Sequence, residues 1–293
     1  MSSRLLITGA SGILGDYLLE EARRRGQAVV AWSGASQGDR YGVTLIPVDL
    51  ADPQAIQTAF LTAQPQRIIH VAAMASVADC YRQPERARQI NTQATAQLAC
   101  LAAACQARLV FVSTDLVFDG RAAPYRETDG PQPLSVYGAT KAAAESAVLA
   151  YPGHIVARVS LLYGPSRIGR PAFFDQQLVA LRSGQPLSLF ADEWRTPLDL
   201  PTAARGLLEL VESDLTGVIH LGGPERMSRL EMGQRLAAVL GCSDVALRPA
   251  RRDDVPGEPR PRDVSLDSTR WRANFPHLPW PTFEQAVGSL LTR

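Results

Sequence analysis

The sequence predicts an α/β protein in which a doubly wound, parallel sheet is joined to a smaller C-terminal lobe. Short apolar runs alternate with helical segments through the first half of the chain, which is the pattern of a parallel sheet covered by helices on both faces. Beyond Tyr163 and Gly164 this alternation stops, and glycine, proline and arginine become more frequent. We therefore expect a sheet-forming domain over residues 1–164 and mainly a lobe over residues 165–293.

The elements of the first half follow from local signals. Apolar runs bounded by polar residues predict strands, and longer segments closed by residues such as Gly26 predict helices. The predicted strands are Arg4–Thr8, Ala28–Trp32, Thr44–Val48, Arg67–Ala72, Arg108–Ser113 and His154–Ser160. The predicted helices are Ile13–Arg25, Pro53–Ala63, the alanine-rich Pro84–Cys105, and one that carries Tyr137 and Lys141 after a loop at Asp119–Pro133.

In the second half of the chain, predicted strands and helices alternate less regularly. Phe173–Ser183 and Ser228–Leu240 are predicted helices, and Val218–Leu221 is a predicted strand. Gly257–Arg262 is rich in proline and is expected to be irregular. Segments near residues 201–222 are expected to return to the main sheet, so the boundary between sheet and lobe is crossed more than once.

Composition narrows the class of protein. The chain has 293 residues, a formal net charge of +1, 46% hydrophobic and 20% charged residues, so neither nucleic acid nor an acidic membrane is expected as a partner. The arginines of residues 248–262 are interleaved with acids, which favours a solvated loop. No Cys-x-x-Cys pair, metal-ligand spacing, signal peptide or membrane-length apolar stretch is evident. These features favour a cytoplasmic protein without a metal site.

A glycine-rich turn joins the first predicted strand to the first predicted helix. Its sequence, Thr8-Gly-Ala-Ser-Gly-Ile-Leu-Gly15, lets the backbone turn tightly, approach a pyrophosphate and pack the helix on the strand. A helix N-terminus also offers free N–H groups and a partial positive charge to phosphates. The turn therefore predicts a Rossmann-type dinucleotide site, with these candidate contacts: Gly9, Ser11, Gly12, Ile13, Leu14 and Gly15.

The second strand bears on the choice of cofactor. An acid about twenty residues after the glycine turn would favour NAD by binding the ribose 2′-hydroxyl. This chain has Trp32-Ser33-Gly34 there, with no acid before Asp39. Because Ser33 and Arg40 could accept a 2′-phosphate, the sequence favours NADP(H) and leaves NAD(H) open.

Further cofactor contacts are expected where the next strands end. Asp49, followed by Leu50, could accept a hydrogen bond from the adenine amino group or could cap the next helix. The small residues Ala72 and Ala73, followed by Met74, would let a flat cofactor lie against the backbone.

Tyr137 and Lys141 stand four residues apart, so they share one face of a helix. A cation beside a phenol favours the phenolate, which suits the tyrosine to proton transfer. Thr114 ends the strand expected to face the nicotinamide, where its hydroxyl could hold a substrate carbonyl, or it could cap the strand end. The adjacent Asp115 reads as a residue that orders the loop. Thr114, Tyr137 and Lys141 are the candidate catalytic residues, and the last two are also candidate cofactor contacts.

These motifs together resemble the extended short-chain dehydrogenase/reductase family. Within it, Ser113-Thr-Asp-Leu-Val-Phe-Asp-Gly120 and Pro133-Leu-Ser-Val-Tyr-Gly-Ala-Thr-Lys141 are similar to the dTDP-4-dehydrorhamnose reductase branch. The chain departs from that branch at Leu116 and Leu161, where a tyrosine and a tryptophan are typical, and its segment Asp192–Pro197 is closer to sugar epimerases. The glycine turn also resembles the regulatory subunit of methionine adenosyltransferase.

The resemblance implies an NAD(P)H-dependent reductase of a nucleotide-linked 4-keto sugar. In that reading Tyr137 protonates the carbonyl oxygen, Thr114 holds it, and Lys141 binds the nicotinamide ribose and lowers the tyrosine pKa. Arg195 or Arg167 would contact the diphosphate from a substrate-binding lobe, and a homodimer is an option. Two alternatives stay open: a nucleotide-sugar epimerase or dehydratase, and a non-catalytic NADP-binding regulatory subunit.

Overall fold

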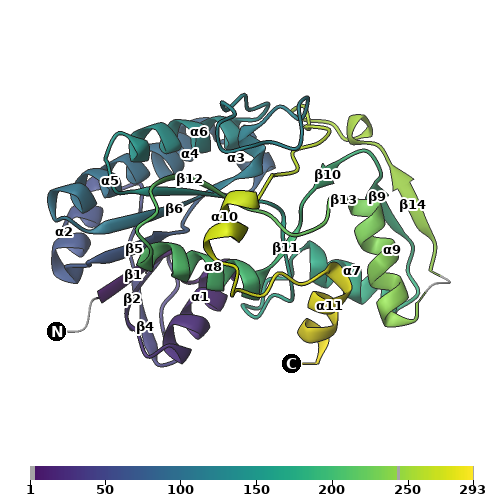
Figure 1. Cartoon of the computed structure of the whole chain (residues 1–293), viewed down its shortest axis with the longest axis horizontal. Helices are drawn as coiled ribbons and strands as arrows, with labels where there is room; N and C mark the ends of the chain where they lie inside the picture. Colours follow the sequence, from purple (N-terminus) through teal and green to yellow (C-terminus); the bar gives the residue numbers. More distant parts are fainter. Residues whose placement is uncertain (1–3, 243–244, 293) are drawn as a thin grey trace.

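A computed structural model describes residues 4–242 and 245–292. A large twisted sheet with its helices fills one side of the molecule, and a smaller lobe built around α7 and α9 fills the other (Figure 1). The sheet has eight strands in the order β12-β7-β6-β5-β1-β2-β4-β3, and only the β3–β4 pair is antiparallel. In chain order these strands are β1 (Arg4–Thr8), β2 (Ala28–Ser33), β3 (Asp39–Arg40), β4 (Val43–Pro47), β5 (Arg67–His70), β6 (Arg108–Thr114), β7 (Ile155–Val159) and β12 (Gly217–Leu221).

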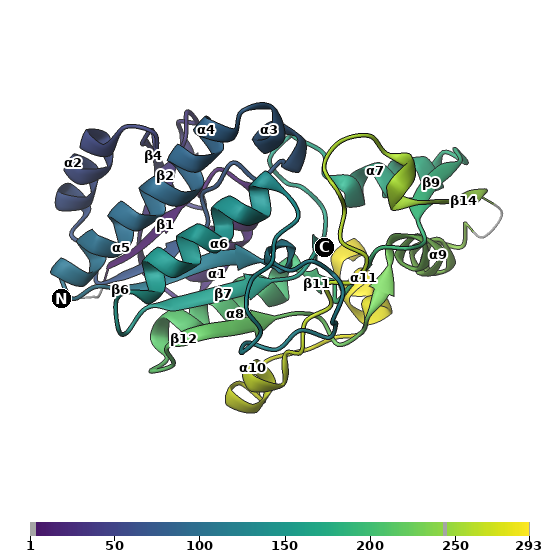
Figure 2. The same ribbon diagram turned by 90° about the horizontal axis from the view of Figure 1, so that it is seen from above.

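Helices cover both faces of the sheet, which confirms the predicted doubly wound fold. Strand residues alternate between two cores: Leu5 and Ile7 pack with one set of helices, while Leu6 packs with the other. The first set is α1 (Ile13–Arg24) and α8 (Leu200–Glu212), and the second is α2 (Pro53–Ala63), α5 (Ala94–Ala104) and α6 (Val136–Leu149). Figure 2 shows α2, α5 and α6 side by side over one face. The site described below lies where strands of this sheet end.

The predicted strands and helices of the first half agree with the structure to within a few residues. The main difference is the long helix expected over Pro84–Cys105, which consists of α4 (Pro84–Ala87), a π-helical turn (Arg88–Gln93) and α5. Such π turns often mark functional sites, because they redirect side chains within a helix. Here the turn carries Asn91, whose side chain holds both backbone groups of Met74. The short helix α3 (Val77–Arg82) was not predicted.

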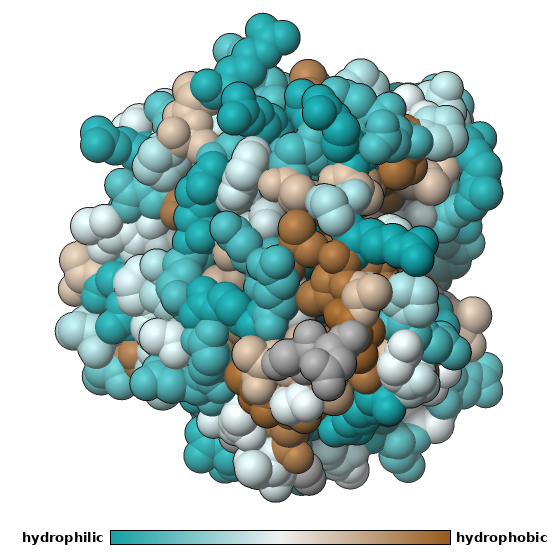
Figure 3. Space-filling model, turned by 90° about the vertical axis from the view of Figure 1, so that its right-hand side faces the viewer, coloured by the Kyte–Doolittle hydropathy of each residue, from teal (hydrophilic) through white to brown (hydrophobic). Residues whose placement is uncertain are grey.

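The second half builds the lobe and also extends the sheet. Strand β12 pairs in parallel with β7, and α8 packs against α1. The lobe has its own core, formed by α7 (Phe173–Arg182), α9 (Arg229–Leu240) and α11 (Phe283–Leu291). Hydrophilic side chains cover most of the outer face of the lobe, and apolar ones gather in one band (Figure 3).

Short two-stranded sheets occur in the second half of the described chain. The pairs are β8 (Leu162–Tyr163) with β11 (Leu198–Asp199), β9 (Leu187–Phe190) with β14 (Leu247–Ala250), and β10 (Trp194–Arg195) with β13 (Met227–Ser228). Helix α10 (Thr269–Asn274) packs Trp271 into the main core. Gly257–Arg262 forms neither helix nor strand, in line with the irregular segment predicted there.

A fully buried ion pair fastens α6 to the sheet. Arg158 and Glu145 are each about 2% exposed, and the Arg158 Nη2 and Nε atoms donate to the Glu145 carboxylate at 2.8 to 3.2 Å. The Ser113 hydroxyl donates to the same carboxylate at 2.5 Å. Burial and the nearby Arg158 charge lower the pKa of His220 to about 3, so its neutral ring can accept from Arg158 Nη1 at 3.4 Å. This pair therefore has partners for nearly all its polar atoms.

Two kinds of feature are absent from the described part of the chain. None of its helices has the length and apolar character needed to cross a membrane. Residues 4–242 and 245–292 also contain no cluster of three or more His, Cys, Asp or Glu side chains placed to hold a metal ion.

Candidate active site

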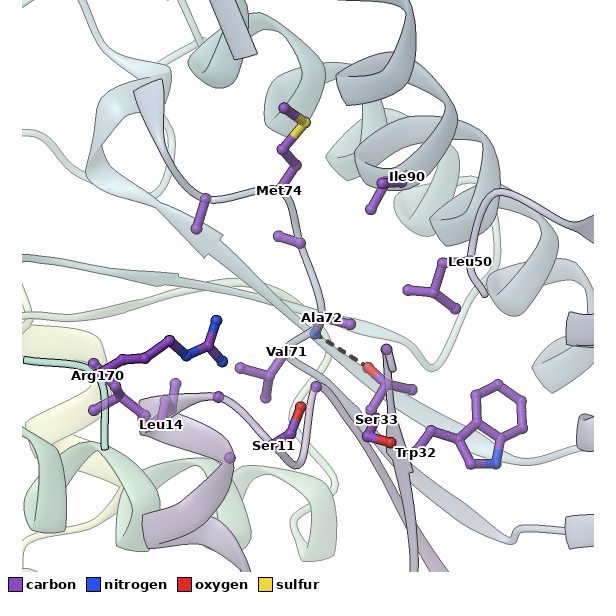
Figure 4. Close-up of a pocket in the computed structure, with 18 of the residues that line it drawn as sticks. Ser11, Leu14, Trp32, Ser33, Leu50, Val71, Ala72, Met74, Ile90 and Arg170 are labelled. Carbon is purple, nitrogen blue, oxygen red and sulfur yellow. Dashed lines mark hydrogen bonds between the residues drawn. The ribbon is translucent and has the colours of Figure 1, made fainter. Parts of the chain in front are cut away.

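A cleft of about 840 Å³ opens above the turn between β1 and α1. Figure 4 shows Ser11 and Leu14 on one wall, Ser33 and Trp32 at one end, and Met74 and Ile90 opposite. Its volume falls in the range of ligand pockets. The structure brings these sequence-predicted cofactor residues to the lining: Gly9, Ser11, Gly12, Ile13, Leu14, Gly15, Ser33, Asp49, Leu50, Ala72, Ala73 and Met74. Tyr137 and Lys141 lie outside that lining.

The glycine turn fits a dinucleotide for reasons of backbone geometry. Gly9 has φ of +68°, and a Cβ there would lie 2.7 Å from the Ala72 nitrogen. A Cβ at Gly15 would collide with the Gly9 carbonyl oxygen, so Gly15 lets α1 pack tightly on the turn. Gly12 is the N-cap of α1 and has no side chain to cap it, which leaves the first N–H groups of the helix available to an anion.

At the adenosine end, the structure changes two expectations. Arg40 does not line the cleft, because its Nη1 lies 3.3 Å from Asp16 Oδ1, and a different arginine, Arg86, lines this end. Asp49 is not the cap of α2, since Asp52 accepts from the Gln54 and Ala55 N–H groups. Asp49 Oδ1 instead lies 3.3 Å from Arg86 Nη2. Arg86 thus lies beside Asp49 in the lining of the cleft, and no sequence motif marks it.

Arg170 is a second arginine that the sequence reading missed. It lines the cleft, and Figure 4 shows its guanidinium reaching toward Val71 from the side of the lobe. Its position near Ser11 and Leu14 places a positive charge close to the glycine turn. Arg167, which was considered for a substrate diphosphate, instead pairs with Glu20 at 2.7 Å and stacks on Tyr17.

Thr114 and Tyr137 come together where α6 approaches the end of β6, and Lys141 lies one turn further along α6. Ser135 caps α6, and a Cβ at Gly138 would collide with the Leu116 carbonyl oxygen, so this glycine lets α6 approach the end of β6. The approach brings the Tyr137 hydroxyl close enough to Thr114 for the threonine side chain to lower the tyrosine pKa. Thr114 also accepts from the Leu116 N–H at 3.1 Å, so it does cap the strand end as well.

The electrostatics of this group differ from the expectation. Desolvation and the nearby Asp115 charge raise the pKa of Tyr137 above its ordinary value, and only Thr114 opposes them. Desolvation also lowers the pKa of Lys141 to about 7, although Glu145 partly offsets this. The Lys141 ammonium lies 4.0 Å from the centre of the Phe111 ring. The expected lowering of the tyrosine pKa by Lys141 is therefore wrong for this arrangement, because burial dominates both groups.

Asp115 does more than order a loop. It is 4% exposed, accepts from Ser160 Oγ at 3.0 Å, and lies 3.2 Å from Arg195 Nη1. This ion pair joins the end of β6 to β10, two segments far apart in the sequence. Arg195 thereby contacts the residue that follows Thr114 in the sequence.

The second cavity has a volume of about 450 Å³, and its lining includes sequence neighbours of Thr114 and Tyr137. Leu116 and Ser135 line it from the side of the sheet, and Arg195, Glu258 and Arg260 line it from the second half of the chain. Glu258 Oε1 accepts from the Val136 N–H at 2.6 Å, while its Oε2 is buried without a hydrogen bond. Arg260 is paired with Glu193, so this part of the arginine-rich stretch is not the solvated loop that its composition suggested.

Known proteins are similar to this chain in sequence. The family model described as "RmlD substrate binding domain" matches residues 3–293. The beta subunit of methionine adenosyltransferase 2 from Bos taurus is 34% identical over 280 residues, covering 91% of this chain and 81% of the relative. A probable low-salt glycan biosynthesis reductase from Haloferax volcanii is 29% identical over 292 residues, covering 97% and 96%.

A solved structure shares the fold over its whole length. The dTDP-4-dehydrorhamnose reductase from Bacillus anthracis, crystallised with NADP, superposes with a TM-score of 0.88 at 24% identity. The match covers 100% of this chain and 99% of that chain.

Proposed function

The chain belongs to the RmlD substrate binding domain family, and from this membership we propose that it is an NAD(P)H-dependent reductase of a nucleotide-linked 4-keto sugar. The observation that carries the proposal is the proximity of Tyr137 to Thr114 at the end of β6, in a chain with two cavities. One cavity has the glycine turn and the uncapped helix end that suit a dinucleotide. The other has arginines and a carboxylate that suit a polar, anionic substrate.

In the proposed reaction, a nicotinamide bound in the first cleft supplies the hydride. Tyr137 donates its proton to the substrate carbonyl oxygen, a role suited to a phenol whose raised pKa keeps it protonated at neutral pH. Thr114 orients the Tyr137 hydroxyl and holds the same oxygen. Lys141 lies one helical turn beyond Tyr137 and would bind the nicotinamide ribose, with its charge set by a pKa of about 7.

NADP(H) is the favoured cofactor in this proposal. Ser33 ends β2 where an acid would repel a 2′-phosphate, and Arg86 lines that end of the cleft. The Bacillus anthracis reductase was crystallised with NADP. NAD(H) remains an alternative cofactor, because Arg86 also contacts Asp49 and could interact with the adenine instead of a 2′-phosphate.

The test is to follow absorbance of NADPH and NADH with a panel of nucleotide-linked 4-keto sugars. We expect stoichiometric oxidation of the nucleotide with at least one of them. Turnover of a nucleotide sugar without net oxidation would instead support the epimerase or dehydratase alternative, in which the hydride returns to the substrate.

A second candidate is favoured by the 34% identity to the beta subunit of methionine adenosyltransferase 2. In that case the chain would bind NADP and regulate a catalytic partner, because a fold can keep its site while its role moves to another surface. Co-purification with a methionine adenosyltransferase, together with no turnover on the sugar panel, would support this role and contradict reduction.

A further inference from the structure

His70 is a fully buried histidine at the end of β5, directly before a part of the chain that lines the dinucleotide cleft. Residues 71–76, which follow it, form neither helix nor strand, and most of them line the cleft. Because this stretch belongs to no helix or sheet, its position depends on the side chains that bind its backbone groups. Two of these side chains are Thr8 and Asn91.

Thr8 and Asn91 hold this stretch at two points. The Ala72 N–H donates to Thr8 Oγ1 at 3.2 Å, a bond drawn in Figure 4. The Met74 N–H donates to the Asn91 side-chain oxygen at 2.8 Å, and the Asn91 amide donates to the Met74 carbonyl oxygen at 3.1 Å. Thr8 ends β1, whereas Asn91 belongs to the π-helical turn, so the stretch is fastened to two separate elements.

The imidazole ring of His70 joins these two anchors. Its Nδ1 atom lies 2.7 Å from Thr8 Oγ1, and its Nε2 atom lies 2.9 Å from Thr95 Oγ1. The Thr95 hydroxyl in turn donates to the Asn91 carbonyl oxygen at 2.7 Å. One buried ring therefore connects Thr8 with the turn that carries Asn91.

These hydrogen bonds fix which nitrogen of His70 carries the hydrogen. Thr95 donates its single hydroxyl proton to a carbonyl oxygen, so toward His70 it can only accept, and Nε2 must carry the hydrogen. Thr8 Oγ1 accepts from the Ala72 N–H, and its own proton is available to Nδ1. Desolvation, together with the nearby Lys141 charge, lowers the pKa of His70 to about 3, so the ring is neutral at neutral pH. Both ring nitrogens then have a partner.

The same chain of bonds continues to the catalytic helix α6. The Asn91 amide donates to Thr140 Oγ1 at 3.1 Å, and the Thr140 hydroxyl donates to the Tyr137 carbonyl oxygen at 2.8 Å. The Thr92 hydroxyl donates to the Thr140 carbonyl oxygen at 2.8 Å, which is a second contact between the π-helical turn and α6. A shift of this turn would therefore move the helix that carries Tyr137 and Lys141.

We propose that His70 is a positioning residue that keeps the dinucleotide cleft and the catalytic helix in a fixed relation. Through Thr8 it holds the wall of the cleft, and through Thr95 it holds the π-helical turn that contacts α6. His70 itself is enclosed and lines neither cavity, so it acts through these neighbours. Its effect on turnover rests on the proposed function, whereas its effect on dinucleotide binding rests on the cleft alone.

Two conservative variants of the full chain separate the two halves of this network. In His70→Asn, the side-chain oxygen can replace Nδ1 as the acceptor for Thr8, while the contact with Thr95 is lost. In His70→Gln, the longer side chain can replace Nε2 as the donor to Thr95, while the contact with Thr8 is lost. The matched control is His154→Gln. His154 is also buried, its Nε2 lies 3.3 Å from the Ala99 carbonyl oxygen, and it lines neither cavity.

Fluorescence titration gives the dissociation constant for NADPH, and steady-state rates with a confirmed keto sugar at saturating NADPH give kcat. We expect His70→Gln to bind NADPH about tenfold more weakly with kcat nearly unchanged, which is the size of one lost buried hydrogen bond. We expect the reverse for His70→Asn, with kcat about tenfold lower and NADPH binding nearly unchanged. His154→Gln should lower the unfolding temperature and leave both quantities nearly unchanged.

A spectroscopic signature checks the network without any turnover. Nitrogen-15 NMR of the chain with labelled histidines should show one ring signal that is lost in His70→Asn. That ring should carry its hydrogen on Nε2 and should not titrate between pH 6 and pH 8. A hydrogen on Nδ1, or titration in this range, would contradict the bonding pattern and with it the proposal.

A histidine that only stabilises the fold would give a different result. Both variants would then have a lower unfolding temperature, and NADPH binding and kcat would change together or not at all, which overturns the positioning role. Failure of the unmodified chain to reduce any keto sugar would contradict the proposed function only. The positioning role is then decided by binding: weaker NADPH binding in His70→Gln but not in His70→Asn supports it, and equal binding by the two variants overturns it.

Discussion

Two regions of this molecule bury charged side chains, and they treat them in opposite ways. Between α6 and the sheet, Arg158 and Glu145 are enclosed with partners on nearly every polar atom, including Ser113 and His220. Around the candidate site, Lys141 is enclosed against the ring of Phe111, and Arg229 has no hydrogen bond at all among the described residues. In the first arrangement the two charges stabilise each other in the folded chain. In the second arrangement, charged groups remain that could still bind a ligand.

The difference teaches where function is to be sought. A fully partnered buried pair gives little reason to expect a ligand, because its desolvation is already offset within the chain. An enclosed charge without a partner opposes folding, and a protein keeps such a group where a ligand or a reaction uses it. Substitutions in the two regions should therefore change stability in opposite directions.

The largest effect is expected at Tyr137, which supplies the proton in the proposed reaction. Tyr137→Phe removes the hydroxyl alone and should lower kcat roughly a hundredfold to ten-thousandfold, the usual range for a general acid. Steady-state rates of NADPH oxidation with a confirmed substrate measure this. Turnover close to that of the unmodified chain would exclude Tyr137 as the acid. Tyr41→Phe serves as the control, since this phenol is 41% exposed and lines neither cavity.

The next effect is the loss of stability when the partnered pair is broken. Arg158→Met leaves Glu145 buried without its cation, which should lower the free energy of unfolding by about 3–5 kcal/mol. Urea unfolding measures the change. The double variant Arg158→Met with Glu145→Leu removes both charges and should recover much of it. A single variant as stable as the unmodified chain would show that the pair is not needed.

A smaller effect of opposite sign is expected at Lys141. Burial lowers its pKa from 10.5 to about 7, so between these values the unfolded chain binds a proton that the folded chain does not. The free energy of unfolding should therefore rise with pH across this window. In Lys141→Met the free energy of unfolding should no longer contain the part of this rise that comes from Lys141. The variant should be more stable than the unmodified chain at pH 7, and it should reduce keto sugars poorly. Unfolding at pH 7 and pH 9 compares the two proteins, and an identical pH dependence would contradict the prediction.

The smallest effect concerns the choice of cofactor. Arg86→Gln should weaken NADPH binding by about tenfold or less, as expected for a half-exposed arginine on a phosphate, and leave NADH binding nearly unchanged. Fluorescence titration with both cofactors gives the ratio of the two dissociation constants. Arg40→Gln, whose arginine faces Asp16 rather than the cleft, should leave that ratio unchanged. Equal weakening of both cofactors in Arg86→Gln would assign Arg86 to the adenine instead.

The sequence by itself determined the parts of this protein that depend on neighbouring residues. The turn from Gly9 to Gly15, the helix face shared by Tyr137 and Lys141, and the strands of the main sheet all follow from local spacing and backbone preference. Even the strand that joins the sheet from the second half, Gly217–Leu221, has a local apolar pattern.

Only the tertiary structure decided which remote charges meet and how strongly burial acts on them. Arg195 and Glu258 come from separate segments, and no spacing in the chain places them around one cavity. Asp49 lost its capping role to Asp52, and Arg86 stands at the adenosine end where Arg40 was expected. The pKa of Tyr137 is raised rather than lowered, because desolvation depends on everything packed around the hydroxyl, which four residues of sequence do not specify.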